Sequence, residues 1–148
     1  MTFKEIQEYA RQLLRDVNRT IFQEIEITRT INEGVDRMRS VPELRAMRKL
    51  TSPDEEPILV PEEFHHLLSL YSASRCFFQD EQFTQSATLM NEFESKFFEL
   101  KDAIQNGDIV IKDENSEAVE TGENQIDAVK NVYFKTRKPA DFDEVIIF

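Results

Sequence analysis

The chain has 148 residues, enough for one ordinary domain, which excludes large multidomain machinery. It carries 18 Lys and Arg against 29 Asp and Glu, a formal net charge of −11 that argues against gripping duplex DNA through its phosphates. No run approaches the ~20 apolar residues of a membrane-spanning helix, so we expect no membrane association. The N-terminus lacks the apolar segment of a secretory signal, and a single cysteine excludes an internal disulfide. Both features are typical of synthesis in the cytoplasm.

The apolar pattern predicts the fold class. Glycine is rare, and apolar residues recur at spacings of three to four positions, which indicates helices through most of the chain. Charge is uneven: residues 1–50 hold 10 basic and 8 acidic residues, whereas residues 51–148 hold 8 and 21. We expect an all-α fold, a small bundle of three to four helices with a minor β-hairpin element and an extended C-terminal arm.

The first half of the chain predicts two helices. Thr2 followed by Glu5 has the spacing of a capping box, and apolar residues on one face predict a helix over about 3–17. A second helix is expected over about 23–39, because Pro42 disfavours α geometry at the preceding residue. Residues 41–61 are rich in proline. Their short apolar pieces, 47–50 and 58–60, favour pairing as a small hairpin.

The second half predicts an antiparallel helix pair. Pro61 followed by two glutamates suits a helix start, and this third helix should run to about Phe78. A polar break at 79–82 precedes a fourth helix over about 83–104, which Gly107 should close. The bulky faces of the two helices are expected to meet. The adjacent face of the third helix is small and would let another helix approach closely, through Ser69, Ser72, Ala73 and Cys76.

Beyond residue 105 the composition changes. Residues 109–111 look like a short strand, and 113–124 are acidic and poor in apolar residues, which predicts a mobile loop. We divide the chain into a helical domain (1–105), an acidic flexible loop (106–125) and a C-terminal docking arm (126–148). The arm either docks on a partner or folds back to cap its own core. Its expected docking residues are Tyr133, Phe134, Phe142, Val145, Ile146, Ile147 and Phe148.

The chain offers little for catalysis. Glu62 and His65 have the Glu-x-x-His spacing of di-iron sites, but the only two histidines are neighbours, and the site would need a second copy of the motif. We interpret them as half-exposed residues of a first helical turn. Cys76 is interpreted as a buried small side chain without a base to activate it. We therefore expect no enzyme activity, no cofactor and no metal.

The basic residues of the first half form one concentration. A nucleic-acid site would add interleaved aromatic residues or a free recognition helix, and neither is evident. We interpret this group as a charged face that pairs with acidic residues of the same or a neighbouring chain. Its members are Arg29, Arg37, Arg39, Arg45, Arg48 and Lys49.

The order of motifs resembles a known family. Residues 61–66 read Pro-Glu-Glu-Phe-His-His, 70–75 read Leu-Tyr-Ser-Ala-Ser-Arg, Asp80-Glu81 interrupt the pattern, and 92–94 read Glu-Phe-Glu. Together with the two earlier helices, these features resemble the helical head-to-tail adaptor (connector) proteins of tailed bacteriophages. The resemblance covers most of residues 3–105, with the closest match over 61–104, and residues 106–148 match no motif of that family.

The resemblance implies a structural virion protein of the phage neck. Several copies, usually a dodecamer, form a ring beneath the portal protein, lengthen the DNA channel and present a surface to the next neck or tail component. DNA would pass without specific binding, as an acidic ring permits. The alternative is a small acidic helical regulator or inhibitor that binds a host or phage partner, and a metal-dependent enzyme comes third.

Overall fold

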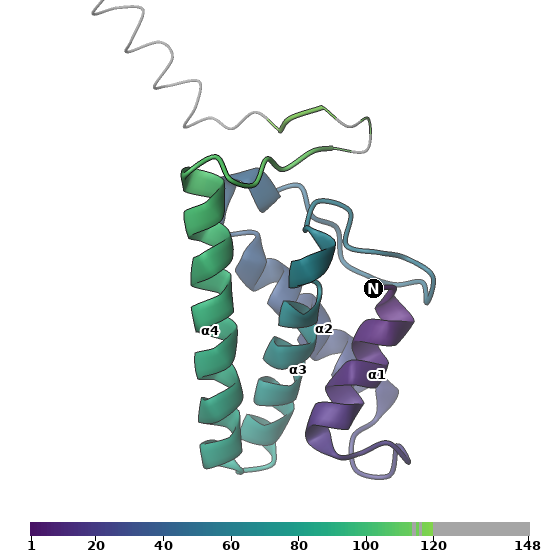
Figure 1. Cartoon of the computed structure of the whole chain (residues 1–148). Helices are drawn as coiled ribbons and strands as arrows, with labels where there is room; N and C mark the ends of the chain where they lie inside the picture. Colours follow the sequence, from purple (N-terminus) through teal and green to yellow (C-terminus); the bar gives the residue numbers. More distant parts are fainter. Residues whose placement is uncertain (114, 116, 120–148) are drawn as a thin grey trace, which may run out of the picture.

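The structure is a computed structural model that describes residues 1–113, 115 and 117–119. Within that part of the chain the fold is all-α, as predicted. Four α-helices form it: α1 (Phe3–Leu14), α2 (Glu24–Met38), α3 (His66–Gln79) and α4 (Phe83–Gln105). Helix α3 lies at the centre and contacts the three others, with α1 and α4 on opposite sides of it (Figure 1). No helix of the described residues is long and apolar enough to cross a bilayer.

Helix α1 begins at the predicted capping box and ends earlier than predicted. The Thr2 hydroxyl accepts the Glu5 N–H (3.3 Å), and the Glu5 carboxylate accepts the Thr2 N–H (2.7 Å). At the other end Arg15 adopts a left-handed conformation (φ 56°) that stops the helix after Leu14. The turn that follows is organised by Asp16, whose carboxylate accepts backbone N–H groups further along, so residues 15–17 leave the helix.

Helix α2 lies within one residue of its predicted bounds. The Gln23 N–H donates to the Glu26 carboxylate (3.1 Å), which satisfies one of the free donors at the helix start. The apolar residues of its buried face form part of the core together with those of α1. They are Ile27, Ile31, Val35 and Met38 on α2, and Phe3, Ile6, Ala10 and Leu14 on α1.

The hairpin expected within residues 41–61 is not confirmed. One short 3₁₀ helix, η1 (Pro42–Leu44), opens this segment, and neither apolar piece is a strand. Its backbone bonds go elsewhere: Pro53 and Glu55 carbonyls accept the first N–H groups of α1 (3.1 and 2.6 Å). The Asn32 side chain also bonds the backbone of Leu50: its Oδ1 accepts the Leu50 N–H (2.8 Å), and its Nδ2 donates to the Leu50 carbonyl (3.0 Å). The start of α1 and the Asn32 side chain thus act as the hydrogen-bond partners that a second strand would have provided for this backbone.

The third predicted helix begins as a 3₁₀ turn. Residues Glu62–Phe64 form η2, and the α-helix starts only at His66, one turn later than expected. Pro61 still opens the element, as predicted, and the Phe64 N–H donates to its carbonyl (2.9 Å). Helix α3 then runs to Gln79, one residue past the predicted end.

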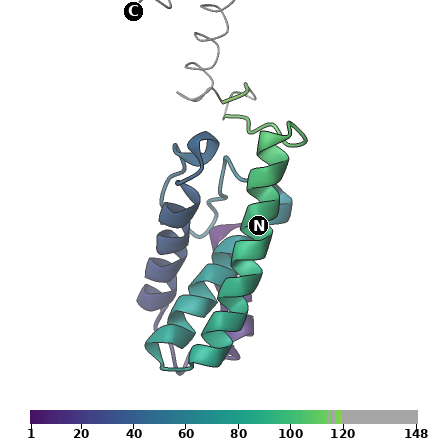
Figure 2. The ribbon, with the colours of Figure 1, turned by 90° about the vertical axis from the view of Figure 1, so that its left-hand side faces the viewer.

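Helices α3 and α4 form the predicted antiparallel pair. The Tyr71 ring meets Phe93 edge-on at 5.2 Å, and Phe93 lies 5.4 Å from Phe97. Near the turn the chains approach closely, because the Ser74 and Ser86 hydroxyls each donate to the other's backbone carbonyl at 2.8 Å. The two helices run side by side in both views (Figures 1 and 2). Their shared interface therefore holds the largest buried aromatic side chains.

Helix α4 ends as predicted. Asn106 is its last residue with helical geometry, and Gly107 takes a left-handed conformation (φ 78°). The strand predicted at 109–111 does not form, and nearby an isolated antiparallel bridge joins Lys112 to Ala118. Ile111 is buried against the bundle. The C-terminal docking arm, residues 126–148, lies outside the described residues.

Candidate interaction surface

The two histidines differ sharply in their surroundings. His65, expected to be half-exposed, is buried, whereas His66 is half-buried on the first turn of α3. Nε2 of His65 lies 2.8 Å from the Val60 carbonyl and therefore carries the proton, so Nδ1 accepts from the Met1 ammonium at 2.9 Å. Burial lowers the pKa of His65, and the neighbouring ammonium lowers it further. His65 thus acts as a neutral tie between η2 and the start of the chain.

The described residues hold no group of three or more side chains suited to a metal ion. Glu62 lies in η2 with its side chain in solvent, 3.9 Å from the Met1 ammonium. His65 faces the protein interior. The Glu-x-x-His spacing therefore does not bring Glu62 and His65 together as ligands.

The four small residues predicted on α3 all lie in the core. Ser69 donates to the Ile6 carbonyl of α1 (2.8 Å), and the Ser72 hydroxyl lies 2.6 Å from that of Thr30 on α2. Ala73 and Cys76 are fully buried. Burial raises the pKa of the Cys76 thiol, which keeps it protonated. The small face of α3 is therefore occupied by helices of the same chain.

A buried ion pair at the α1–α2 connection was not predicted. Arg11 and Asp16 lie 3.1 Å apart and both are almost fully buried. The Asp16 carboxylate also accepts the N–H groups of Thr20 (2.9 Å), Ile21 (3.1 Å) and Phe22 (2.9 Å). Burial alone would raise the pKa of Asp16, but these hydrogen bonds, aided by Arg11, outweigh it and lower the pKa below its usual value. The pair fixes the turn.

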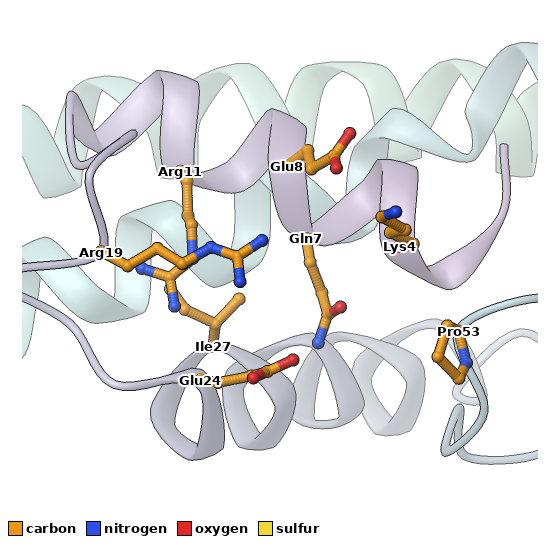
Figure 3. Close-up of a pocket in the computed structure, with 8 residues that line it drawn as sticks. All are labelled: Lys4, Gln7, Glu8, Arg11, Arg19, Glu24, Ile27 and Pro53. Atoms are coloured by element: carbon orange, nitrogen blue, oxygen red, sulfur yellow. The ribbon is translucent and has the colours of Figure 1, made fainter.

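The Arg11 side chain also lines a pocket of about 320 Å³ between α1 and α2 (Figure 3). Lys4 and Arg19 contribute two further cations, and Glu8 and Glu24 face them with two carboxylates. Since Asp16 already neutralises Arg11, the remaining charges cancel. This pocket has no preference for a ligand of one charge, and we assign it no function.

Most of the basic cluster on α2 and the following segment pairs with acidic residues of the same chain. Arg29 pairs with Glu33 (3.3 Å), and Arg37 reaches across to Glu94 on α4 (3.2 Å). Asp36 forms ion pairs with both Arg39 (3.7 Å) and Lys49 (4.0 Å). The interpretation of this cluster as a charged face that answers acidic residues is confirmed for these four basic side chains.

The α1–α2 connection and the α3–α4 turn lie at the same end of the bundle, which we call the turn end (Figure 1). Apolar side chains are exposed there. Five large apolar side chains there are at least half exposed: Val17, Ile21, Ile25, Phe78 and Phe83. Phe78 and Phe83 contact each other edge-on at 5.3 Å across the α3–α4 turn. Between the connection and the turn runs a groove of about 490 Å³, the turn-end groove, lined by Leu13, Ile21, Phe77 and Leu89 among others.

The opposite end carries further exposed apolar side chains. Ile58 belongs to the irregular 45–61 segment, and Val110 follows α4. We call this the loop end. Phe98 is a further exposed ring on α4. Apolar side chains that the fold leaves uncovered at both ends indicate contact with other proteins.

These surfaces were largely missed by sequence reasoning, which placed the docking function on residues 133–148. Those docking residues lie outside the described part of the chain. The exposed turn-end residues flank helix starts and stops, where helical periodicity no longer predicts which side chain is covered. The chain matches no protein-family model, no curated protein and no solved structure.

Proposed function

We propose that the protein is a structural virion protein of a tailed bacteriophage, located in the neck. Several copies form a ring beneath the portal, join the head to the tail and extend the DNA channel. The observation that carries this proposal is the exposure of large apolar side chains at both ends of a small helical bundle. A subunit held between two other components needs a surface for each, and apolar area gains free energy when a partner covers it.

The placement of the motifs behind the resemblance supports the proposal. Residues 61–66 supply Pro61 and the buried His65. Residues 70–75 form a part of α3 that contacts α2 through Ser72 and α4 through Tyr71 and Ser74. In the Glu-Phe-Glu element, Phe93 is buried and Glu94 holds Arg37 of α2. These motifs specify the junction of three helices, which is the kind of feature that a shared fold preserves.

The charge of the chain also supports a channel protein. With a net charge of −11, a ring of copies repels the phosphates of DNA and lets the duplex pass without specific binding. The partners that follow are the portal protein, neighbouring copies and the next neck or tail component. In this proposal the protein is not an enzyme and uses no cofactor.

The test is to mix the full chain with isolated portal rings and to examine the mixture by sedimentation and electron microscopy. We expect an added ring of density on one face of the portal and co-sedimentation of the protein. A matched variant, Val110→Asp, places a charge on the loop end and should weaken the binding, whereas Ser95→Asp on the exposed face of α4 should not. A protein that keeps a one-copy mass and ignores the portal would contradict the proposal and favour the acidic regulator.

A further inference from the structure

We infer that the turn-end groove is the receptor for the C-terminal arm of a neighbouring copy, which inserts the apolar residues 145–148. This inference rests on the proposed function, because it supplies the contact that joins copies within the ring.

The groove has the size and lining of a peptide-binding site. Its volume, about 490 Å³, lies within the ~300–1,000 Å³ typical of ligand sites. Leu14 and Phe22 lie buried at its base, and Leu13, Phe77 and Leu89 form half-buried walls. Polar residues of α4, including Gln85 and Thr88, form one rim. An apolar floor with a polar rim favours an apolar side chain whose backbone remains near water.

The surroundings of the groove enlarge the apolar area. Ile21 lines it with 61% of its surface exposed, and Val17 and Ile25 lie before and after it in the chain. On the α3–α4 side, the Phe78 and Phe83 pair continues the surface beyond Phe77. One solitary exposed residue would need no explanation, but five at one end, beside a groove, indicate an occupant.

The arm has the complementary composition. Residues 145–148 read Val-Ile-Ile-Phe, four consecutive large apolar side chains, and Asp141, Asp143 and Glu144 precede them. The rim of the groove carries Arg15, whose left-handed backbone (φ 56°) ends α1. Among the described residues, no ion pair engages the Arg15 side chain. Asp80 also lines the groove, at the α3–α4 turn, so an acidic segment beside the apolar anchors would pair with Arg15 on the side of the α1–α2 connection, which fixes the direction of the arm.

The length of the arm is sufficient. The arm together with the last residues of the acidic loop, 120–148, numbers 29 residues, and a chain of that length spans at most about 95–105 Å at ~3.3–3.6 Å per residue. Helix α4, with 23 residues, covers only about 35 Å at 1.5 Å per residue. The described chain leaves α4 at the loop end, opposite the groove (Figure 1). The arm can therefore reach a groove on an adjacent subunit.

The opposite placement of the two surfaces favours a neighbouring copy. The described chain leaves α4 toward the arm at the loop end, and the groove lies at the turn end, so each subunit offers one surface and receives another. Such a heterologous contact repeats from copy to copy and closes into a ring when the rotation permits. A contact of this kind also leaves the Ile58 and Val110 surface available for a different partner.

The test is a cross-link between two full-length variants. Thr88→Cys places a thiol on the rim of the groove, and Ile147→Cys places one on the arm; native Cys76 is fully buried and does not compete. Mixed in equal amounts with a mild oxidant, the two should form a disulfide-linked pair, with the 88–147 bond identified by peptide mass mapping. Ser95→Cys, exposed about two turns further along α4, is the matched control and should link at least about tenfold less.

Two outcomes would overturn the inference. One is equal linking of the groove and control thiols. The other is a double variant, Thr88→Cys with Ile147→Cys, that links only within one chain, which would mean that the arm caps its own subunit. Adding Ile21→Asp to the groove variant should abolish the 88–147 bond. No portal is present in this experiment, so its failure would leave portal binding by the unmodified protein as the separate test of the proposed function.

Discussion

The interior around α3 and the turn end of the bundle differ in whether their side chains have partners within the chain. In the interior, buried hydroxyl groups find partners within the chain: Ser69 donates to the backbone of α1, and the Ser72 hydroxyl bonds that of Thr30 on α2. At the turn end, apolar residues such as Ile25 remain in water. The difference separates two roles, because the interior residues determine the fold and the end residues are left for association.

The largest expected effect is on the aromatic interior. Phe93→Ala should lower the free energy of unfolding by ~3–5 kcal/mol, because it removes a fully buried ring that contacts Tyr71 and Phe97. Denaturant unfolding followed by circular dichroism measures this loss. Phe98→Ala, five residues along the same helix but exposed, should change stability by no more than ~0.5 kcal/mol. Similar losses in both variants would break the contrast between buried and exposed rings.

The next effect is on the buried ion pair. Asp16→Ala should cost ~3–5 kcal/mol, because it leaves Arg11 buried without its partner and frees three backbone N–H groups. Asp36→Ala, which removes a half-exposed partner of Arg39 and Lys49, should cost ~0–1 kcal/mol. Thermal unfolding of the two variants measures the difference. A mild effect of Asp16→Ala would mean that the α1–α2 turn holds its shape without this carboxylate.

A smaller loss is expected at His65. His65→Gln should cost ~1–3 kcal/mol, because it disturbs a buried bond to the Val60 carbonyl. The neighbouring His66, half-buried on α3, is the matched control, and His66→Gln should be close to neutral. Equal losses of stability in the two variants would mean that His65 is half-exposed, as the sequence predicts.

The same residue predicts a dependence on pH. The pKa of His65 is lowered in the fold, so the unfolded chain binds the proton more readily. Its stabilising contribution is complete above the unfolded pKa of about 6.5 and is lost as the pH falls through the lower, folded pKa. Unfolding curves between pH 8 and pH 5 should therefore show a decline in stability that is reduced in His65→Gln. An identical pH profile in both proteins would contradict this assignment.

The smallest effect is expected at the turn end. Ile25→Ser should alter the free energy of unfolding by no more than ~0.5 kcal/mol, since the side chain is 73% exposed in the isolated chain. Its consequence should be seen in the mass of the assembled protein, measured by light scattering. Ile27→Ser, two residues along and fully buried, is the comparison and should be strongly destabilised. A large loss of stability in Ile25→Ser would mean that the turn end belongs to the core.

The helices themselves followed from local patterns in the sequence. The Thr2 and Glu5 box, the proline at 61 and Gly107 each mark an element boundary by a backbone mechanism that acts within a few residues, and the structure keeps all three. The antiparallel pair followed from the short polar break before Phe83. Bounds were less accurate where a loop side chain intervened, as at residue 15, where Asp16 gathers backbone donors from beyond the helix.

What could not be predicted depends on contacts between distant parts of the chain. The hairpin failed because Asn32 and the start of α1 compete for the backbone of the 47–55 segment. His65 was expected to be half-exposed because its partners, Val60 and the first residue, are brought to it only by folding. The candidate interaction surface was missed for the same reason: Ile21 and Leu89 are far apart in sequence and share a groove only in the folded chain.

The central position of α3 has a consequence for synthesis of the protein on the ribosome. Helices α1 and α2 contact each other little, and both lay their apolar faces on α3, through bonds such as Ser69 to Ile6 and Ser72 to Thr30 that join residues 63 and 42 positions apart. The first two helices therefore emerge without a surface to cover them and wait until residue 79 has left the exit tunnel. Chaperones are therefore most needed while only the N-terminal half of the chain has been made. Helix α4, the last helix of the bundle to be synthesised, completes folding, and its pairing with α3 is local and fast.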